Sequence, residues 1–247
     1  MKRLLIAAAA LALVTTAANA QTVRLATEGA YAPFNFVDDD GAAAGFEIDL
    51  GNEICSRAAL DCEWVITAWD TMIPNLLAGN YDVIMAGMSI TEERLQSISF
   101  SDDYFPPDPS RFAMAADADI DVAAMAGLRI GAQAATSQLG YIQANLADDN
   151  TVLSYETFDQ AIADLAAGNL DVVLADGGYL EPIVAATDGA LVLADAAVMI
   201  GGGIGAGIRK EDTDLLATFS QVIGEMKADG TLNALIIQWF DNPNTFD

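Results

Sequence analysis

Short β-type segments alternate with segments of helical period along most of this chain, and no other feature limits its possible folds as much. The run Val23–Thr27 alternates between apolar and polar residues, as a half-buried strand does. Every fourth residue across 46–58 is apolar, which gives a helix one apolar face. Glu47, Asp49 and Glu53 are then expected on its solvent face. Alternating strands and helices predict an α/β fold, in which sheets carry helices on both faces.

The other expected elements follow the same alternation. Strands are expected at 34–37, 63–67, 83–86, 129–132, 152–155, 172–175 and 204–208, and helices at 71–78, from 91 onward, and at 137–146, 158–167, 213–228 and 232–239. The chain is long enough to form one large domain or two smaller domains with separate cores.

The first twenty residues have the order of a secretory signal peptide. Met1-Lys2-Arg3 is basic, 4–14 is apolar, and Ala18-Asn19-Ala20 supplies the small residues of a cleavage site. A membrane anchor needs about 20 apolar residues to cross the bilayer, and this run is shorter. We therefore expect residues 1–20 to be removed and the mature chain to act in the periplasm, free in solution.

Composition excludes several classes of function. The hydrophobic content of 53% is too high for a disordered chain. The formal net charge of −26 repels nucleic acid and anionic membrane surfaces, so no nucleic-acid partner is expected.

The two cysteines, Cys55 and Cys62, predict a local disulfide, because an exported chain meets an oxidising compartment. Their spacing is not that of a Cys-x-x-Cys redox pair. The sequence contains no histidine, so a zinc site would lack its usual ligand and a Ser-His-Asp triad cannot form. We expect no metal, no cofactor and no catalytic residues, and we interpret the chain as a binding protein and not an enzyme.

Four motifs in order resemble those of a known family. They are 27–34 (TEGAYAPF), 45–50 (GFEIDL), 69–74 (WDTMIP) and 87–94 (GMSITEER). The sequence is similar, over the whole mature chain, to the periplasmic polar-amino-acid-binding proteins of bacterial ABC importers. The cysteine spacing is similar to that of the members for lysine, arginine, ornithine and opines, in the wider lysine/arginine/ornithine/histidine/opine group.

The resemblance implies a two-lobed periplasmic-binding-protein fold, each lobe a sheet flanked by helices. We expect 21–106 together with 202–247 to form lobe 1 and 107–201 to form lobe 2, with a two-crossing hinge near Pro106-Pro107 and 201–203. Ligand contacts from both lobes would favour a closed form that the membrane permease of the importer recognises. A monomer is expected.

The resemblance also assigns ligand contacts. Arg94 would bind the α-carboxylate of an amino acid, helped by the backbone N–H groups of Ser89 and Ser137. Asp176 ends a predicted strand, where α/β sheets place ligand groups, and would bind the α-ammonium together with the carbonyl of Gly87. An exposed Arg94 paired with a neighbouring Glu is the alternative, and Asp176 could instead begin an ordinary turn.

Tyr31 and Trp69 would enclose the ligand side chain, with Met88 beside them in its motif. Glu28 would face the distal charge of a cationic side chain such as lysine, arginine or ornithine, or of an opine; its alternative position is in solvent beside the cleft. The sequence departs from the family at Ala86, where some members have serine, and at 135–137, where a glycine-containing turn is common. These changes leave the ligand open.

Two further functions stay open at this point. A few relatives on the same scaffold are cyclohexadienyl dehydratases, which act on prephenate- or arogenate-type substrates through an acidic side chain, and Glu28 could supply that acid. A glutamine or glutamate binder is the other possibility.

Overall fold

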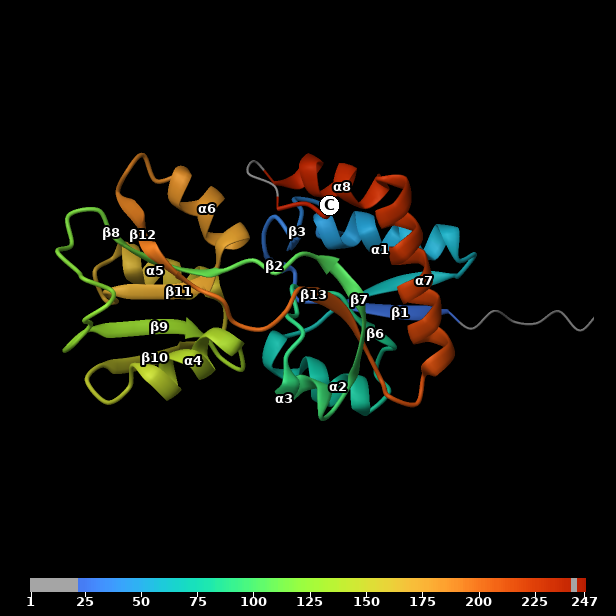
Figure 1. The fold of residues 1–247 in the computed structure, drawn as a ribbon, viewed down its shortest axis with the longest axis horizontal. Helices are drawn as coiled ribbons and strands as arrows, with labels where there is room; N and C mark the ends of the chain where they lie inside the picture. Colours follow the sequence, from blue (N-terminus) through green and yellow to red (C-terminus); the bar gives the residue numbers. More distant parts are fainter. Residues whose placement is uncertain (1–21, 241–243) are drawn as a thin grey trace, which may run out of the picture.

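The computed structural model describes residues 22–240 and 244–247, so the predicted signal peptide lies outside the described residues. Two five-stranded sheets with their helices form two lobes that lie side by side (Figure 1). No helix in the described part of the chain is long and apolar enough to span a bilayer.

The first lobe is built on a mixed sheet with the strand order β5-β1-β6-β13-β7. Its strands are β1 (Val23–Thr27), β5 (Cys62–Ile66), β6 (Val83–Ile84), β7 (Ser99–Phe105) and β13 (Ile204–Ile208). The first three are parallel to one another, and β13 is antiparallel to both β6 and β7. The helical segments are α1 (Phe46–Arg57), η1 (Trp69–Thr71), α2 (Met72–Leu77), α3 (Glu92–Leu95), α7 (Thr213–Asp229) and α8 (Thr231–Trp239). A small sheet adds β2 (Ala30–Tyr31), β3 (Asn35–Val37) and β4 (Ala43–Ala44).

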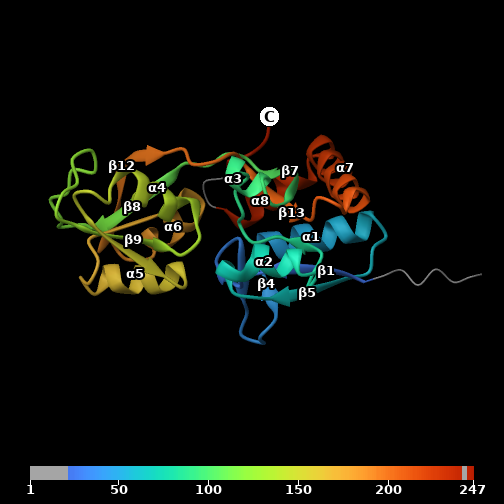
Figure 2. The same ribbon diagram turned by 90° about the horizontal axis from the view of Figure 1, so that it is seen from below.

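The second lobe repeats this plan with the strand order β10-β9-β11-β8-β12. Its strands are β8 (Ser110–Ala115), β9 (Arg129–Gln133), β10 (Thr151–Tyr155), β11 (Val172–Asp176) and β12 (Leu191–Val198), and its helices are α4 (Ser137–Asn145), α5 (Phe158–Ala166) and α6 (Gly177–Ala185). Strands β9, β10 and β11 are parallel, whereas β8 is antiparallel to both of its neighbours, β11 and β12. Figure 2 shows this lobe from below, with α5 on one side of the sheet.

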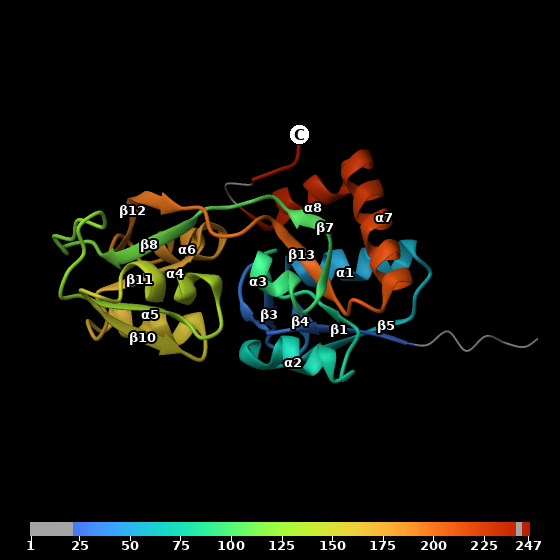
Figure 3. The ribbon, with the colours of Figure 1, turned by 60° about the horizontal axis from the view of Figure 1, so that its bottom comes forward.

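The chain crosses between the two sheets twice. It passes from β7 to β8 through 106–109 and returns from β12 to β13 through 199–203. Because β7 pairs with β13 and β8 pairs with β12, the two crossings run together, as Figure 3 shows. The C-terminal residues lie beside the first crossing, where the Asn244 side-chain amide donates to the Pro107 carbonyl at 2.9 Å.

Helix α1 forms where its apolar spacing predicts, and Phe46, Leu50 and Ile54 are fully buried. The prediction for Glu47 was wrong. Its side chain is also fully buried, because it lies against hydrogen-bond donors from other segments instead of facing water.

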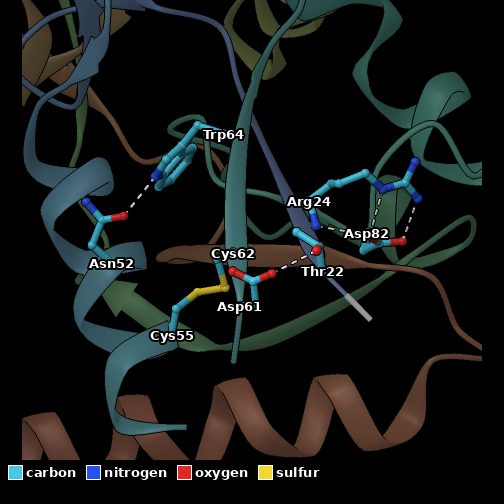
Figure 4. The surroundings of a disulfide bond; sticks show 8 residues. All are labelled: Thr22, Arg24, Asn52, Cys55, Asp61, Cys62, Trp64 and Asp82. Atoms are coloured by element: carbon cyan, nitrogen blue, oxygen red, sulfur yellow. Dashed lines mark hydrogen bonds and ion pairs between the residues drawn. A yellow bond between two sulfur atoms is a disulfide. The ribbon is translucent and has the colours of Figure 1, made fainter. Parts of the chain in front are cut away.

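The predicted disulfide is confirmed: Cys55 near the end of α1 is bonded to Cys62 at the start of β5 (Figure 4). The indole N–H of Trp64 on β5 donates to the Asn52 side chain on α1 at 3.0 Å, so a polar contact supports the same packing. Both contacts fix the helix that follows the small sheet onto the edge strand of lobe 1.

Candidate functional site

A small cavity of about 10 Å³ lies between the two lobes, well below the volume of ordinary small-molecule sites, so a bound amino acid would have to displace side chains such as Tyr31. Lobe 1 lines it with Glu28, Tyr31, Trp69, Ala86, Gly87, Ser89 and Arg94, and lobe 2 with Gln133, Thr136, Ser137, Gln138, Phe158 and Asp176. A larger hollow lies near the first crossing, lined by residues such as Phe105, Trp239 and Pro182. We take the smaller cavity as the candidate site because it brings opposite charges from both lobes together.

Strand ends explain why these residues meet. Glu28 directly follows β1, and Gly87 lies shortly after β6, both at carboxyl ends of parallel strands in lobe 1. Gln133 and Asp176 are the last residues of β9 and β11 in lobe 2. Open α/β sheets bind ligands at such carboxyl ends, and here those of the two sheets face one cavity.

Arg94 is held by the segment around the start of α3. Thr91 caps this helix by accepting a hydrogen bond from the Arg94 backbone at 3.2 Å, and the Arg94 guanidinium donates to the Ser89 carbonyl at 2.8 Å. Its central carbon lies 5.3 Å from the centroid of the Trp69 ring, a cation–π distance. Burial lowers the pKa of Arg94 to about 10, while the negative charges of Asp176 and Glu93 act to raise it. Arg94 therefore stays charged at neutral pH. No ion pair to Glu92 or Glu93 occurs within 22–240.

Asp176 is the acidic group on the opposite lobe. One carboxylate oxygen accepts from the Tyr31 hydroxyl and the other from the Gln138 side-chain amide, both at 2.7 Å. Burial raises the pKa of Asp176 to about 6. The Tyr31 ring is stacked on Tyr179 of lobe 2 at 4.3 Å with an interplanar angle of 8°. An ammonium bound to Asp176 would therefore share the carboxylate with the Tyr31 hydroxyl or displace that hydroxyl from it.

Glu28 lies in the cavity and not in solvent beside it. One of its oxygens accepts from the Gln133 side-chain amide at 2.5 Å, and the same amide donates to the Glu156 carbonyl at 2.9 Å. Burial raises the pKa of Glu28 to about 7, and the charges of Asp159 and Asp70 act in the same direction. Burial thus makes Glu28 a carboxyl group that loses its proton less readily than an exposed glutamate.

The remaining predicted residues differ in how they reach the cavity. The Trp69 side chain is 8% exposed, and its buried indole N–H has no hydrogen-bond partner in the described chain. Ser137 is the first residue of α4, where backbone N–H groups lack partners within the helix and favour an anion. Gly87 has φ +66 and lies against the Tyr31 ring, so a side chain there would meet both strain and the ring. Met88 is buried in a cluster with Trp69 and does not line the cavity.

Five lining residues were not among the predicted contacts: Ala86, Gln133, Thr136, Gln138 and Phe158. Ala86 was noted only as a departure from the family. Gln133 could have been found by the strand-end rule that identified Asp176, since it follows a predicted strand. Thr136 was noted only as part of an unusual turn. In that turn Ala135 has φ +56, a conformation that normally favours glycine. Gln138 and Phe158 carry no comparable signal.

Comparisons with known proteins identify the family. The model of the bacterial extracellular solute-binding proteins, family 3, matches residues 23–242. A lysine/arginine/ornithine-binding periplasmic protein of Escherichia coli is 35% identical, with 98% of each chain covered. A histidine-binding periplasmic protein of Salmonella typhimurium is 36% identical, with 91% of this chain and 90% of the relative covered.

A solved structure gives the same result at the level of the fold. A periplasmic His/Glu/Gln/Arg/opine family-binding protein from Silicibacter pomeroyi, in complex with lysine, has a TM-score of 0.84 and 45% identity, covering 91% of this chain and all of that chain. The match spans both lobes and the cavity between them. The chain belongs to family 3 of the bacterial extracellular solute-binding proteins.

Proposed function

We propose that this protein binds a cationic α-amino acid, such as lysine, arginine or ornithine, or an opine, between its two lobes. The observation that carries the proposal is the set of charges in one cavity: Arg94 is positive, and Glu28 and Asp176 are negative when ionised. A cationic amino acid offers the complementary set, with one carboxylate and two positive groups. Arg94 would bind the carboxylate, Asp176 the α-ammonium and Glu28 the side-chain charge.

The other lining groups complete this site. Ser89, Gly87 and Ser137 would supply backbone and hydroxyl contacts, and Trp69 would cover the ligand on one side. Tyr31 would cover it on the other side after leaving Tyr179, with which it now stacks. Met88 would take part only through its backbone, because its side chain is buried elsewhere.

We further propose the wider role that these contacts serve. Residues 1–20 would be removed on export, 21–106 with 202–247 would act as one lobe and 107–201 as the other. The two crossings would act as the hinge. The closed monomer would deliver its ligand to the permease of an ABC importer. The membership in a family of extracellular solute-binding proteins supports this role.

Two other functions are less well supported. A dehydratase using Glu28 as an acid would need relatives that are enzymes, whereas the relatives compared above are binding proteins. A glutamine or glutamate binder would leave an ionised Glu28 in the cavity without a positive partner, which is costly.

The test is a calorimetric and thermal-shift panel of the common amino acids, ornithine and opines. A ligand at about 100 times its Kd stabilises a protein by about 2.7 kcal/mol, which raises Tm by about 5 to 10 °C for a chain of this size. Arg94→Ala should abolish binding of every ligand, and Glu28→Gln should weaken mainly the cationic ones. The matched control is Asp39→Asn, which removes one charge from an exposed turn. Binding of glutamine but not of arginine, lysine or ornithine would refute the assignment of Glu28.

A further inference from the structure

Glu47 lies directly behind the candidate site, although it does not line the cavity. It is in the first turn of α1, and its side chain is fully buried. One carboxylate oxygen accepts from the Gly87 backbone N–H at 2.7 Å and also from the Tyr104 hydroxyl. The other accepts from the Asn35 side-chain amide at 2.7 Å. Burying a carboxylate costs free energy, even where three donors bind it, so its burial here indicates a specific role.

The three donors come from separate segments, and two of these segments face the ligand. Asn35 accepts, with its side-chain oxygen, a hydrogen bond from the Gly29 backbone at 2.8 Å. Gly29 follows Glu28, so the chain of contacts from Glu47 ends beside that side chain. Gly87 begins the segment that carries Ser89, and its backbone lies against the ring of Tyr31. Glu47 therefore connects the two parts of lobe 1 that supply ligand contacts.

The arrangement requires a carboxylate and not an amide at position 47. All three partner atoms donate, and an ionised carboxylate only accepts. Glutamine would place an N–H group opposite the Asn35 amide or opposite the Gly87 N–H, so two donors would face each other in a buried site. Burial raises the pKa of Glu47, and its three hydrogen bonds oppose that rise.

We propose that Glu47 is a positioning residue that holds the segment of Glu28 and Tyr31 in register with the segment of Gly87 and Ser89. This inference rests on the proposed function, since it concerns the affinity for the amino acid. Its effect is indirect: Glu47 touches no ligand, and its removal changes where the contacting groups lie. The loss should affect all amino acids alike, because both segments move.

The experiment is a swap that keeps the total charge and the shapes of the side chains. In Glu47→Gln the amide nitrogen faces the Asn35 amide. In the double variant Glu47→Gln with Asn35→Asp, the new amide donates to the carboxylate introduced at position 35, while its oxygen still accepts from Gly87 and Tyr104. The second oxygen of that introduced carboxylate still accepts from Gly29. Every hydrogen bond is restored with donor and acceptor exchanged at one contact.

Calorimetry with arginine and with lysine should give a Kd about tenfold higher in Glu47→Gln. The two facing donors lower the stability of the free and the bound protein alike, so affinity falls because the segments of Glu28 and Gly87 move apart to separate these donors. The double variant should return to within about threefold of the wild-type Kd. Nuclear magnetic resonance supplies a readout that general stability does not move. The Gly29 amide proton should shift upfield in Glu47→Gln, where the Asn35 oxygen turns from Gly29 toward the new amide, and return downfield in the double variant, where the carboxylate at position 35 accepts from Gly29 again. Each Kd is measured well below the melting temperature of that variant.

A folded Glu47→Gln protein with a Kd within about twofold of wild type overturns the inference, as does a folded double variant that stays as weak as the single one. If Glu47→Gln does not fold, the double variant decides: wild-type-like binding supports the inference, and a double variant that does not bind or does not fold overturns it. A wild-type protein that binds no amino acid in the same assay refutes the proposed function and is a separate outcome.

Discussion

Acidification should weaken the binding of a cationic amino acid far more in the wild-type protein than in Glu28→Gln. Burial raises the pKa of Glu28 to about 7 and that of Asp176 to about 6. Each carboxyl group can face a cation only when it is ionised. A proton therefore competes with the ligand at each group below its pKa, so affinity falls as pH decreases.

The size of the effect follows from these two pKa values. If a carboxyl group must be ionised for binding, the apparent Kd is multiplied by a factor. This factor is one plus the ratio of the protonated to the ionised form of the group. At pH 5 this factor is about 100 for the pKa of Glu28 and about 10 for that of Asp176. For a free protein with these pKa values, the wild-type Kd should rise by at most about 1,000-fold between pH 8 and pH 5, and that of Glu28→Gln by at most about tenfold. Arg94 stays charged throughout, because its pKa is about 10.

The assay is calorimetry with arginine from pH 5 to pH 8 in buffers of different ionisation enthalpy, so that proton uptake is measured with affinity. Asp39→Asn serves as the control and should keep the full pH dependence of the wild type. This residue is exposed and does not line the cavity. Equal pH dependence in the wild type and in Glu28→Gln would refute the assignment of Glu28 to the ligand charge.

Three other variants test the fold. Replacing Cys55 and Cys62 by serine removes the disulfide between two residues that are seven positions apart. The free energy of unfolding should fall by about 2.5 kcal/mol, which lowers Tm by about 5 to 10 °C in calorimetry. Gly178→Val should push lobe 2 away from Phe34, because even a Cβ atom would come within 3.3 Å of that ring, so small-angle scattering should show a larger radius of gyration and ligand binding should weaken. Ala135→Gly should raise Tm by about 2 °C, because glycine adopts the positive φ there without strain; an unchanged or lower Tm would contradict this reasoning.

The strands and helices of strong period were predictable, and the elements that depend on contacts between segments were not. The sequence predicts α1, α5, α7 and β11 closely, because their own apolar spacing marks the buried face. Strand β7 carries two consecutive aspartates, which indicate a turn, yet Asp103 lies in the strand because Lys227 of α7 pairs with it at 2.6 Å. Helix α6 begins with two glycines and contains Pro182, so local propensity opposes it.

The candidate site shows the same division. Glu28 and Arg94 were predicted from the resemblance to the family, and Asp176 from that resemblance and from its place at the end of a strand; the structure places all three in one cavity. Glu47 was expected in solvent together with the other acidic residues of this helix. At 100° per residue, however, it lies between Ile54 and Ala58 on the apolar side of the helix, so the helical period itself opposed that expectation. Its burial depends on donors from Asn35 and Gly87, 12 and 40 positions away in the chain, and such partners are visible only after folding.

The distribution of charge also connects ligand binding to closure of the lobes. Glu28 and Arg94 belong to one lobe and Asp176 to the other, so they share a cavity only when the lobes approach. The raised pKa values of Glu28 and Asp176 mean that ionising these buried carboxyls is unfavourable unless a positive group faces them. At neutral pH this cost opposes closure, even though the Tyr31 hydroxyl partly satisfies Asp176. A ligand with two positive groups removes the cost at both carboxylates, whereas a neutral amino acid removes it only at Asp176. Because a ligand shifts a conformational equilibrium only by its differential affinity for the two states, the second positive charge should favour closure as well as selectivity.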